Sequence, residues 1–364
     1  MSQTLRAKAG SQSYSIVVGQ PLSKFPAAFA SLAPRGARVV VAADAAITRR
    51  YGAGLLRALK RAGYAAHLLG IPSGETSKTL HEAERIYHFC ARAALERGSW
   101  VIALGGGVVG DLAGFVAGTY LRGIALVQVP TTLLAQVDSS IGGKTGVDIP
   151  QGKNLVGVFY PPRLVWIDPA LLKSLPKAHW RNGMAEVIKY GAILDAALFT
   201  SLEKKVDALL KGYSSAWQPI IARCAALKAR VVQGDPQETR GGRAVLNFGH
   251  SIGHAIEAAT DYRQYLHGEA VSIGMFAASI VSQQQGLIDQ VDRIRLGTLL
   301  THAGLPLRVR RPIPRNRLLE CLSRDKKAAG GAVKFVLLEG IGRGTPGQTV
   351  SPEVLEVALT TVGL

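Results

Sequence analysis

Three histidines and one glutamate have the residue types and spacing of a metal site. His250 and His254 lie four residues apart, and His267 follows in a separate segment. On an α-helix a four-residue step returns almost to the same face, so His250 and His254 are expected to point to one place as co-ligands. Glu186 could supply an oxygen ligand and leave a coordination position open for substrate. The pattern predicts a metal or anionic-substrate site, with a pair of half-buried helix histidines as the alternative.

A glycine-rich turn follows the apolar run at residues 100–104. Gly105, Gly107 and Gly110 have the spacing of the dinucleotide-binding fingerprint, in which missing side chains let the backbone approach a pyrophosphate at a helix N-terminus. The acidic residue expected about twenty positions downstream is absent. Asp44, at the end of another expected strand, is the nearest functional equivalent. The turn predicts dinucleotide binding, with a turn that only packs a helix on a sheet as the alternative.

A second glycine-rich loop, at residues 138–146, imitates the end of a P-loop. A P-loop requires a glycine five residues before Gly143, and Asp138 stands there instead, which excludes the nucleoside triphosphatase interpretation. The loop still offers backbone donors and Lys144, and Lys153 follows nearby. It is expected to be flexible and to hold an anion or part of a cofactor, with a solvated surface loop as the alternative.

The composition is that of a globular protein with two domains. The chain has 364 residues, of which 48% are hydrophobic, and this is enough for a large core. A formal net charge of +18 would suit a polyanion, but the densest basic run, at residues 308–317, carries no aromatic residues for base stacking. We therefore expect no nucleic-acid partner and a solvated basic surface that helps to attract a small anionic substrate.

Nothing in the sequence indicates export or a membrane partner. The first residues lack the apolar core of a signal peptide, and no segment approaches the run of about twenty apolar residues that spans a bilayer. Cys90, Cys224 and Cys321 are widely spaced and odd in number, which argues against a disulfide framework and against a thiolate metal cluster. The expected location is the cytoplasm.

The first half of the chain alternates apolar runs with helical patterns, which is typical of a mainly parallel sheet flanked by helices, in a Rossmann-like layout. After about Leu175 long amphipathic helices predominate, and an apolar run at 333–338 could form a small hairpin. We place an α/β nucleotide-binding domain at residues 1–175 and a mostly α-helical domain at 176–364. The expected strands are 13–18, 37–43, 65–69, 100–104, 125–129 and 164–167, and the expected helices include 49–61, 79–97, 195–211, 216–232 and 271–285.

Several motifs, taken in order, closely resemble the 3-dehydroquinate synthase family of sugar phosphate cyclases. They are residues 105–111, 122–123, 130–135, 138–145, 153–154, 185–189, 246–254 and 267–271. The likeness runs from about Ser73 to Lys326. It implies an NAD-binding α/β domain, an α-helical domain that binds metal and substrate, and an active site in the cleft between them.

The resemblance also implies a reaction. The family converts 3-deoxy-D-arabino-heptulosonate 7-phosphate to 3-dehydroquinate and phosphate, a carbon–oxygen lyase step of the shikimate pathway to chorismate and the aromatic amino acids. The implied steps are transient oxidation by NAD beside a zinc or cobalt ion, phosphate elimination, re-reduction and intramolecular aldol closure. The alternatives are a sister cyclase whose sugar phosphate lacks the carboxylate, a metal-dependent polyol dehydrogenase that releases NADH, and a basic nucleic-acid-binding protein.

By the resemblance, Glu186, His250 and His267 bind the metal, in place of the His250 and His254 pair that spacing alone suggests. His254 instead faces the substrate, for hydrogen bonding or proton transfer. At Ser174 relatives usually have threonine, and the hydroxyl is retained. For NAD, the resemblance points to Asp44, Ser73, Gly74, Glu75, Lys78, Gly107, Val108, Val109, Gly110, Asp111, Thr131, Thr132, Lys144, Lys153, Leu171, Leu172, Lys173 and Ser174.

The carboxylate and the phosphate of the family's substrate both need cationic or amide donors. Relatives are implied to contribute Arg122 across a dimer interface, so a homodimer is expected. The spacing from Lys228 to Arg243 is longer than in relatives, which leaves the role of Lys228 open. The implied substrate-binding residues are Arg122, Lys144, Asn154, Lys189, Lys228, Arg243, Asn247 and Lys326.

Overall fold

The computed structural model describes residues 2–212, 215–328 and 333–364, without the side chains of residues 324–328. The chain divides into two compact units, Met1–Leu175 with Ser215–Gln237, and Pro176–Ser214 with Glu238–Leu364. The first segment ends at Leu175, where the sequence placed its boundary. However, the expectation that residues 176–364 form one domain needs a correction, because Ser215–Gln237 belongs to the first unit.

The correction has a physical reason in helix α8 (Trp217–Gly234). Its buried residues, including Trp217, form the apolar side that an amphipathic helix must cover. That side packs on strands β1 (Gln3–Ala9) and β2 (Gln12–Val18) of the first unit. The sequence shows that this helix is amphipathic but does not show which layer covers its apolar side.

A seven-stranded sheet forms the centre of the first unit, in the order β1-β2-β9-β6-β5-β3-β4. Strands β1 and β2 pair antiparallel and all other neighbours pair parallel, so the predicted mainly parallel sheet is confirmed. β1 was not expected from the sequence, because most of its residues are exposed. The remaining strands are β3 (Arg38–Asp44), β4 (Ala65–Ile71), β5 (Trp100–Gly105), β6 (Ala125–Pro130) and β9 (Leu164–Ile167).

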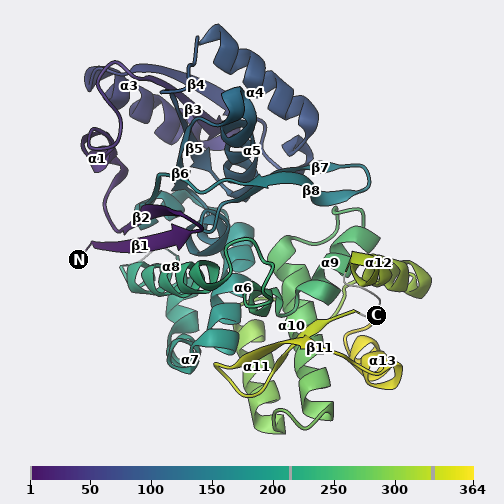
Figure 1. Cartoon of the computed structure of the whole chain (residues 1–364). Coiled ribbons are helices and arrows are strands. Elements are labelled where there is room, and N and C mark those ends of the chain that lie inside the picture. The colour runs from purple at the N-terminus through teal and green to yellow at the C-terminus, as the bar shows by residue number, and fades with distance from the viewer. Residues whose placement is uncertain (1, 213–214, 329–332) are drawn as a thin grey trace. The chain divides into compact units, whose positions relative to one another are not determined.

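Side chains of the central strands alternate between two helical layers, as the two-residue period of a strand requires. Val40 and its neighbours on one face pack with Ile86 of α4 (Leu80–Arg92), whereas Val41 on the other face packs with Leu59 of α3 (Ala53–Arg61). Figure 1 shows α3 and α4 on opposite sides of these strands. The other helices of this unit are listed with their bounds: α1 (Phe25–Phe29), α2 (Ala45–Ile47), α3 (Ala53–Arg61), α4 (Leu80–Arg92) and α5 (Gly107–Thr119).

The segment expected as a flexible loop at residues 138–146 is partly a strand, which corrects that interpretation. Lys144 begins β7 (Lys144–Ile149), which pairs antiparallel with β8 (Gly152–Phe159). A Cβ on Gly146 would lie 2.7 Å from the carbonyl oxygen of Val156. The glycine therefore permits close backbone approach within a hairpin, although in the sequence it indicated a loop.

The second unit is mostly helical, as predicted, and also holds the expected small hairpin, β10 (Phe335–Leu338) with β11 (Gly344–Gln348). Helix α10 begins at His267, four residues before the expected start at 271. In the described ranges, no helix combines the length and apolar character needed to cross a membrane. The helices are α6 (Lys177–Leu194), α7 (Ala196–Leu210), α9 (His250–Ala259), α10 (His267–Gln284), α11 (Gln290–His302), α12 (Arg315–Ala328) and α13 (Pro352–Thr361).

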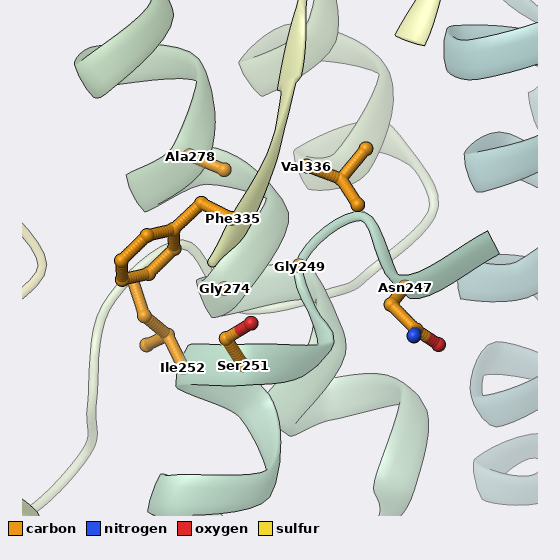
Figure 2. Close-up of a pocket in the computed structure, with 8 residues that line it drawn as sticks. All are labelled: Asn247, Gly249, Ser251, Ile252, Gly274, Ala278, Phe335 and Val336. Carbon is orange, nitrogen blue, oxygen red and sulfur yellow. The ribbon is translucent and has the colours of Figure 1, made fainter. Parts of the chain in front are cut away.

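Helices α9 and α10 contact each other through bare backbone. Gly249 precedes α9 with φ of 78°, a left-handed conformation that favours glycine. A Cβ on Gly274 would overlap the carbonyl oxygen of Gly249, and a Cβ on Gly253 would lie 3.1 Å from the Cα of Val271. Figure 2 shows Gly249 and Gly274 beside the tight crevice that Phe335 closes. These glycines set the separation of the two helices.

We predict that Gly274→Ala lowers the free energy of unfolding by about 1–3 kcal/mol, because the added methyl group overpacks the contact with Gly249. The measurement is thermal and urea unfolding followed by circular dichroism. Gly54→Ala in α3 is the matched control, since a Cβ there meets no atom within 4 Å. The control is expected to be neutral or stabilising by up to about 1 kcal/mol. Equal stability of the two variants would contradict the prediction.

Candidate active site

Glu186, His250 and His267 meet in the second unit. The carboxylate of Glu186 lies on α6 and is 1% exposed, while His250 and His267 are the first residues of α9 and α10. The Nε2 atoms of both histidines lie 3.6 Å from Oε1 of Glu186. One potential ligand atom from each residue falls within 4.8 Å of the others. Three chain segments thus bring one oxygen and two nitrogen donors to a common point.

The hydrogen bonds of the two imidazoles suit a divalent metal. His250 Nδ1 lies 3.1 Å from the carbonyl oxygen of Phe248, and His267 Nδ1 lies 3.1 Å from Oε2 of Glu257. An imidazole that donates its Nδ1–H keeps the Nε2 lone pair for a metal. Both oxygens of Glu186 are buried, with the Lys189 ammonium beside Oε2 and the two imidazole Nε2 atoms beside Oε1. This donor set fits zinc or cobalt.

Lys189, one helical turn after Glu186 on α6, stabilises the charged form of the Glu186 carboxylate. Its side chain is 2% exposed, and its ammonium forms an ion pair with Oε2 of Glu186. Burial favours a higher pKa for Glu186, but Lys189 and the two histidines outweigh it and hold that pKa well below its usual value. The carboxylate is therefore charged at neutral pH and ready to bind a cation.

The pKa values of the two histidines shift in opposite directions. Burial, followed by the charge of Lys189, lowers the pKa of His250 well below its usual value. Burial also acts to lower the pKa of His267, but the hydrogen bonds to Glu186 and Glu257 overcome it and raise that pKa to about 10. His250 is thus neutral at pH 7, whereas a metal would have to compete with a proton at His267.

His254 lies close to this group without being part of the set that includes Glu186. Its ring centroid is 5.3 Å from that of His250 and 6.0 Å from that of His267, and the residue is exposed. The potential ligand atoms of His254 instead group with those of Glu257 and His267. The pairing of His250 with His254 by helical spacing therefore differs from the arrangement around Glu186.

Two other substrate candidates of the second unit are the first and last residues of a short helical turn, Arg243–Asn247. Arg243 is 3% exposed, whereas Asn247 is exposed. In Figure 2 the Asn247 amide points away from Phe335 and the apolar crevice. Lys326 belongs to α12, but its side chain is outside the described part of the structure.

The NAD candidates gather in the first unit, most of them where parallel strands end. β3 pairs with β4 on one side and β5 on the other, and the chain runs outward in opposite directions from this point. Such a switch point is where open α/β sheets bind dinucleotides. Asp44 ends β3, Ser73 to Glu75 and Lys78 follow β4, Gly107 to Asp111 follow β5, Thr131 and Thr132 follow β6, and Leu171 to Ser174 follow β9.

The glycine turn opens α5 directly after β5 and is closely packed. Gly107 is the first residue of α5, and a Cβ there would lie 3.1 Å from Oγ of Ser139. A Cβ on Gly110 would lie 2.8 Å from Oε1 of Gln128 on β6, so this glycine permits close packing of helix on strand. Ser139 Oγ is buried with no hydrogen-bond partner among the described residues. A polar ligand at the start of α5 would fit these groups.

Lys78 connects the turn to the β7–β8 hairpin. Its Nζ lies 2.7 Å from Oδ2 of Asp111 and 2.5 Å from Oδ1 of Asn154. Burial acts to lower the pKa of Lys78, but the neighbouring carboxylates, Asp111 foremost, outweigh it and raise that pKa. Lys153 forms an ion pair with Glu75 at 3.4 Å. Lys78, Asp111 and Asn154 therefore form one polar cluster, and the charge of Glu75 also acts on Lys78.

The remaining candidates of the first unit have varied surroundings. The Ser174 hydroxyl lies 3.1 Å from the Tyr51 hydroxyl. Arg122 is exposed with φ of 65°, and Lys144 is exposed at the start of β7. Lys228, on α8, is 6% exposed and lies in the first unit, although the sequence placed it in the second domain.

Asp138, Ser139 and Glu257 were not selected by the sequence analysis as site residues. Asp138 binds Lys228, whose Nζ lies 2.8 Å from Oδ2. Asp138 and Ser139 stand in the glycine-rich loop that the sequence did single out, so attention to its polar residues would have found them. Glu257 lies three residues after His254, on the neighbouring helical face, which was a usable signal.

Comparison with known proteins identifies the family. Models of the 3-dehydroquinate synthase N-terminal and C-terminal regions match residues 68–182 and 183–328. The 3-dehydroquinate synthase of Symbiobacterium thermophilum is 45% identical, over 96% of this chain and 98% of the relative.

Two solved structures of sugar phosphate cyclases are also similar. The 2-epi-5-epi-valiolone synthase of Streptomyces hygroscopicus subsp. jinggangensis, with NAD+ and Zn2+ bound, is 29% identical with a TM-score of 0.89, and the match covers 98% of each chain. A 2-deoxy-scyllo-inosose synthase complexed with carbaglucose-6-phosphate, NAD+ and Co2+ is 26% identical with a TM-score of 0.88, covering 100% of each chain. From the matched family models and the identity along nearly its whole length, the chain belongs to the 3-dehydroquinate synthase family.

Proposed function

We propose that this chain converts 3-deoxy-D-arabino-heptulosonate 7-phosphate to 3-dehydroquinate and phosphate, with NAD and a divalent metal as cofactors. The observation that carries the proposal is the convergence of Glu186, His250 and His267 in a chain 45% identical to a 3-dehydroquinate synthase. The glycine turn at the end of β5 supports the cofactor assignment, because it opens a helix at the switch point of the sheet.

The two cofactors supply chemistry that side chains lack: NAD carries a hydride away from the substrate and back, and the metal is a Lewis acid for the reacting oxygen. Glu186, His250 and His267 would hold the metal and keep a position open for substrate. Lys189, buried beside Glu186, keeps that carboxylate charged. His254, exposed beside the imidazole pair, is assigned to hydrogen bonding or proton transfer with the substrate.

The doubly anionic substrate requires cationic and amide donors. Arg243 is assigned to an anionic group, since guanidinium pairs with carboxylate or phosphate through two parallel hydrogen bonds. This assignment favours the carboxylate-bearing heptulosonate over a sugar phosphate that lacks the carboxylate, because a guanidinium matches the planar geometry of a carboxylate. The further donors are proposed to be Arg122, Lys144, Asn154, Lys189, Lys228, Asn247 and Lys326.

We also propose a homodimer. Among the described residues β8 pairs with β7 alone, which leaves its other edge able to pair with another strand. Val156 and Val158 pack on the core of the first unit, whereas Leu155 and Phe159 on the other face are 63% and 45% exposed. Covering these side chains with a second copy would remove apolar surface from water. Arg122 would then contribute to the partner's site.

The proposed location is the cytoplasm. The three cysteines are odd in number and widely spaced in the sequence, unlike the paired spacing of disulfide-stabilised exported proteins. Cys90 lies buried in the core of the first unit, where burial raises the pKa of its thiol to about 11. Such a thiol is inert and suits a reducing compartment.

Turnover should release phosphate without accumulating NADH, because the hydride returns to the same substrate. Purified protein is supplied with the heptulosonate phosphate, NAD and zinc or cobalt, and phosphate, 3-dehydroquinate and NADH are followed together. NADH formed in proportion to product would indicate a polyol dehydrogenase. Turnover of a sugar phosphate without a carboxylate, and none of the heptulosonate, would indicate a sister cyclase.

His250→Ala is expected to lose bound metal and at least about a hundredfold in activity together, since Lewis-acid catalysis contributes several kcal/mol. Metal is measured by elemental analysis after dialysis, and activity by phosphate release. The control is His302→Ala, which removes an exposed imidazole at the end of α11 and should change neither quantity. Full activity with stoichiometric zinc in His250→Ala would remove His250 from the site.

Leu155→Asp should convert the dimer to single chains, because a charge at the centre of an apolar interface is costly to bury. Light scattering after gel filtration should give twice the 38.6 kDa chain mass for the original protein and about one chain mass for the variant. Val291→Asp changes a side chain on α11 that is equally apolar and 61% exposed, and should leave the dimer intact. A monomeric original protein would refute the homodimer.

A further inference from the structure

Glu257 is a buried acid for which neither the sequence analysis nor the proposed reaction supplies a role. Glu257 lies on α9 and is 3% exposed, and its Oε2 lies 3.1 Å from Nδ1 of His267. A buried carboxylate is costly unless it is paired or hydrogen bonded. The position of Glu257 therefore requires an explanation in terms of the group it contacts.

The packing of α9 on α10 delivers Glu257 to this place. Gly249 contacts Gly274, and four residues later Gly253 contacts Val271. One further helical step along α9 reaches Glu257, and a step of similar length back along α10 reaches His267. The antiparallel register set by the two glycine contacts thus determines which acid meets the imidazole.

We propose that Glu257 is a positioning residue that selects His267, instead of His254, as the second imidazole ligand. By accepting the Nδ1–H of His267, it fixes the ring so that the Nε2 lone pair faces Glu186. Both imidazoles lie near Glu257, since its carboxylate also groups with His254 and His267. The carboxylate acts on the ring through a hydrogen bond and does not itself bind the metal.

This inference rests on the proposed metal site. A proton shared between Glu257 and Nδ1 of His267 excludes that nitrogen as a metal ligand. The group formed by His254, Glu257 and His267 is then not a second metal site. The chain should bind one divalent ion.

The test compares two substitutions at the same position in the full chain. Glu257→Met keeps a similar volume and removes the acceptor, so zinc affinity should fall about 10–100-fold, as is typical when the partner of a metal-bound histidine is lost. Glu257→Gln keeps an acceptor oxygen and should retain an affinity within a few-fold of the original. Affinities are measured by competition with a chromophoric chelator, and the absorption bands of bound Co2+ report the ligand geometry.

Two control variants accompany these measurements. Glu203→Ala breaks another ion pair of the second unit, the 2.9 Å contact with Arg295, and should leave zinc affinity and the Co2+ spectrum unchanged. His254→Ala should also keep the original zinc affinity, since His254 is not a ligand in this arrangement. Thermal unfolding of each metal-free variant checks the fold, and Glu257→Ala replaces Glu257→Met if the latter does not fold.

The inference would be overturned if folded Glu257→Met, or Glu257→Ala in its place, kept the Co2+ spectrum and the zinc affinity of the original protein. A loss of zinc affinity in Glu257→Gln as large as that in Glu257→Met would also overturn it. So would binding of two Co2+ per chain by the original protein and of one by Glu257→Met. If the original protein binds no divalent ion, the proposed metal site fails at the outset. Failure of the positioning role alone leaves metal binding by the original protein intact, so the two failures are distinguishable.

Discussion

The buried carboxylate of Glu186 is the constraint on which the second unit depends. An ionised carboxylate withdrawn from water costs several kcal/mol unless charges and donors replace the lost hydration. Here the replacements come from Lys189 on the same helix and from imidazoles that begin two other helices. The three helices must therefore meet at one point, and a divalent ion there would complete the charge balance of the group.

Helix separation is the means by which this meeting is achieved. Glycines in α9 and α10 let the backbones touch, so the first residue of α10 reaches the side of α9. A wider spacing would move His267 away from both Glu186 and Glu257. The same close contact thus positions both His267 and the carboxylate beside its Nδ1, which makes the histidine geometry a consequence of backbone packing.

Sequence reasoning succeeded where a local pattern determines the outcome. Buried parallel strands read as apolar runs, so strands β2 to β6 and β9 were predicted almost residue by residue. Features decided by distant partners were not predicted. The apolar side of α8 does not show in the sequence which unit covers it. The exposed residues of β1 lack the apolar run that predicts a strand. Gly146 was interpreted as part of a loop, but it lies in strand β7 of a hairpin.

The candidate site divides along the same line. The expected ends of parallel strands follow from topology, because such strands bring their carboxyl ends to one edge, and the glycine turn and Asp44 were selected as NAD candidates on that ground, whereas Thr131 came from family likeness. The metal residues have no such rule. Helical spacing favoured His254 as the partner of His250, and choosing His267 required either family likeness or the tertiary contact with Glu257. The helical repeat identifies residues that share a helix face, but tertiary packing determines which side chains come close enough to bind one ion.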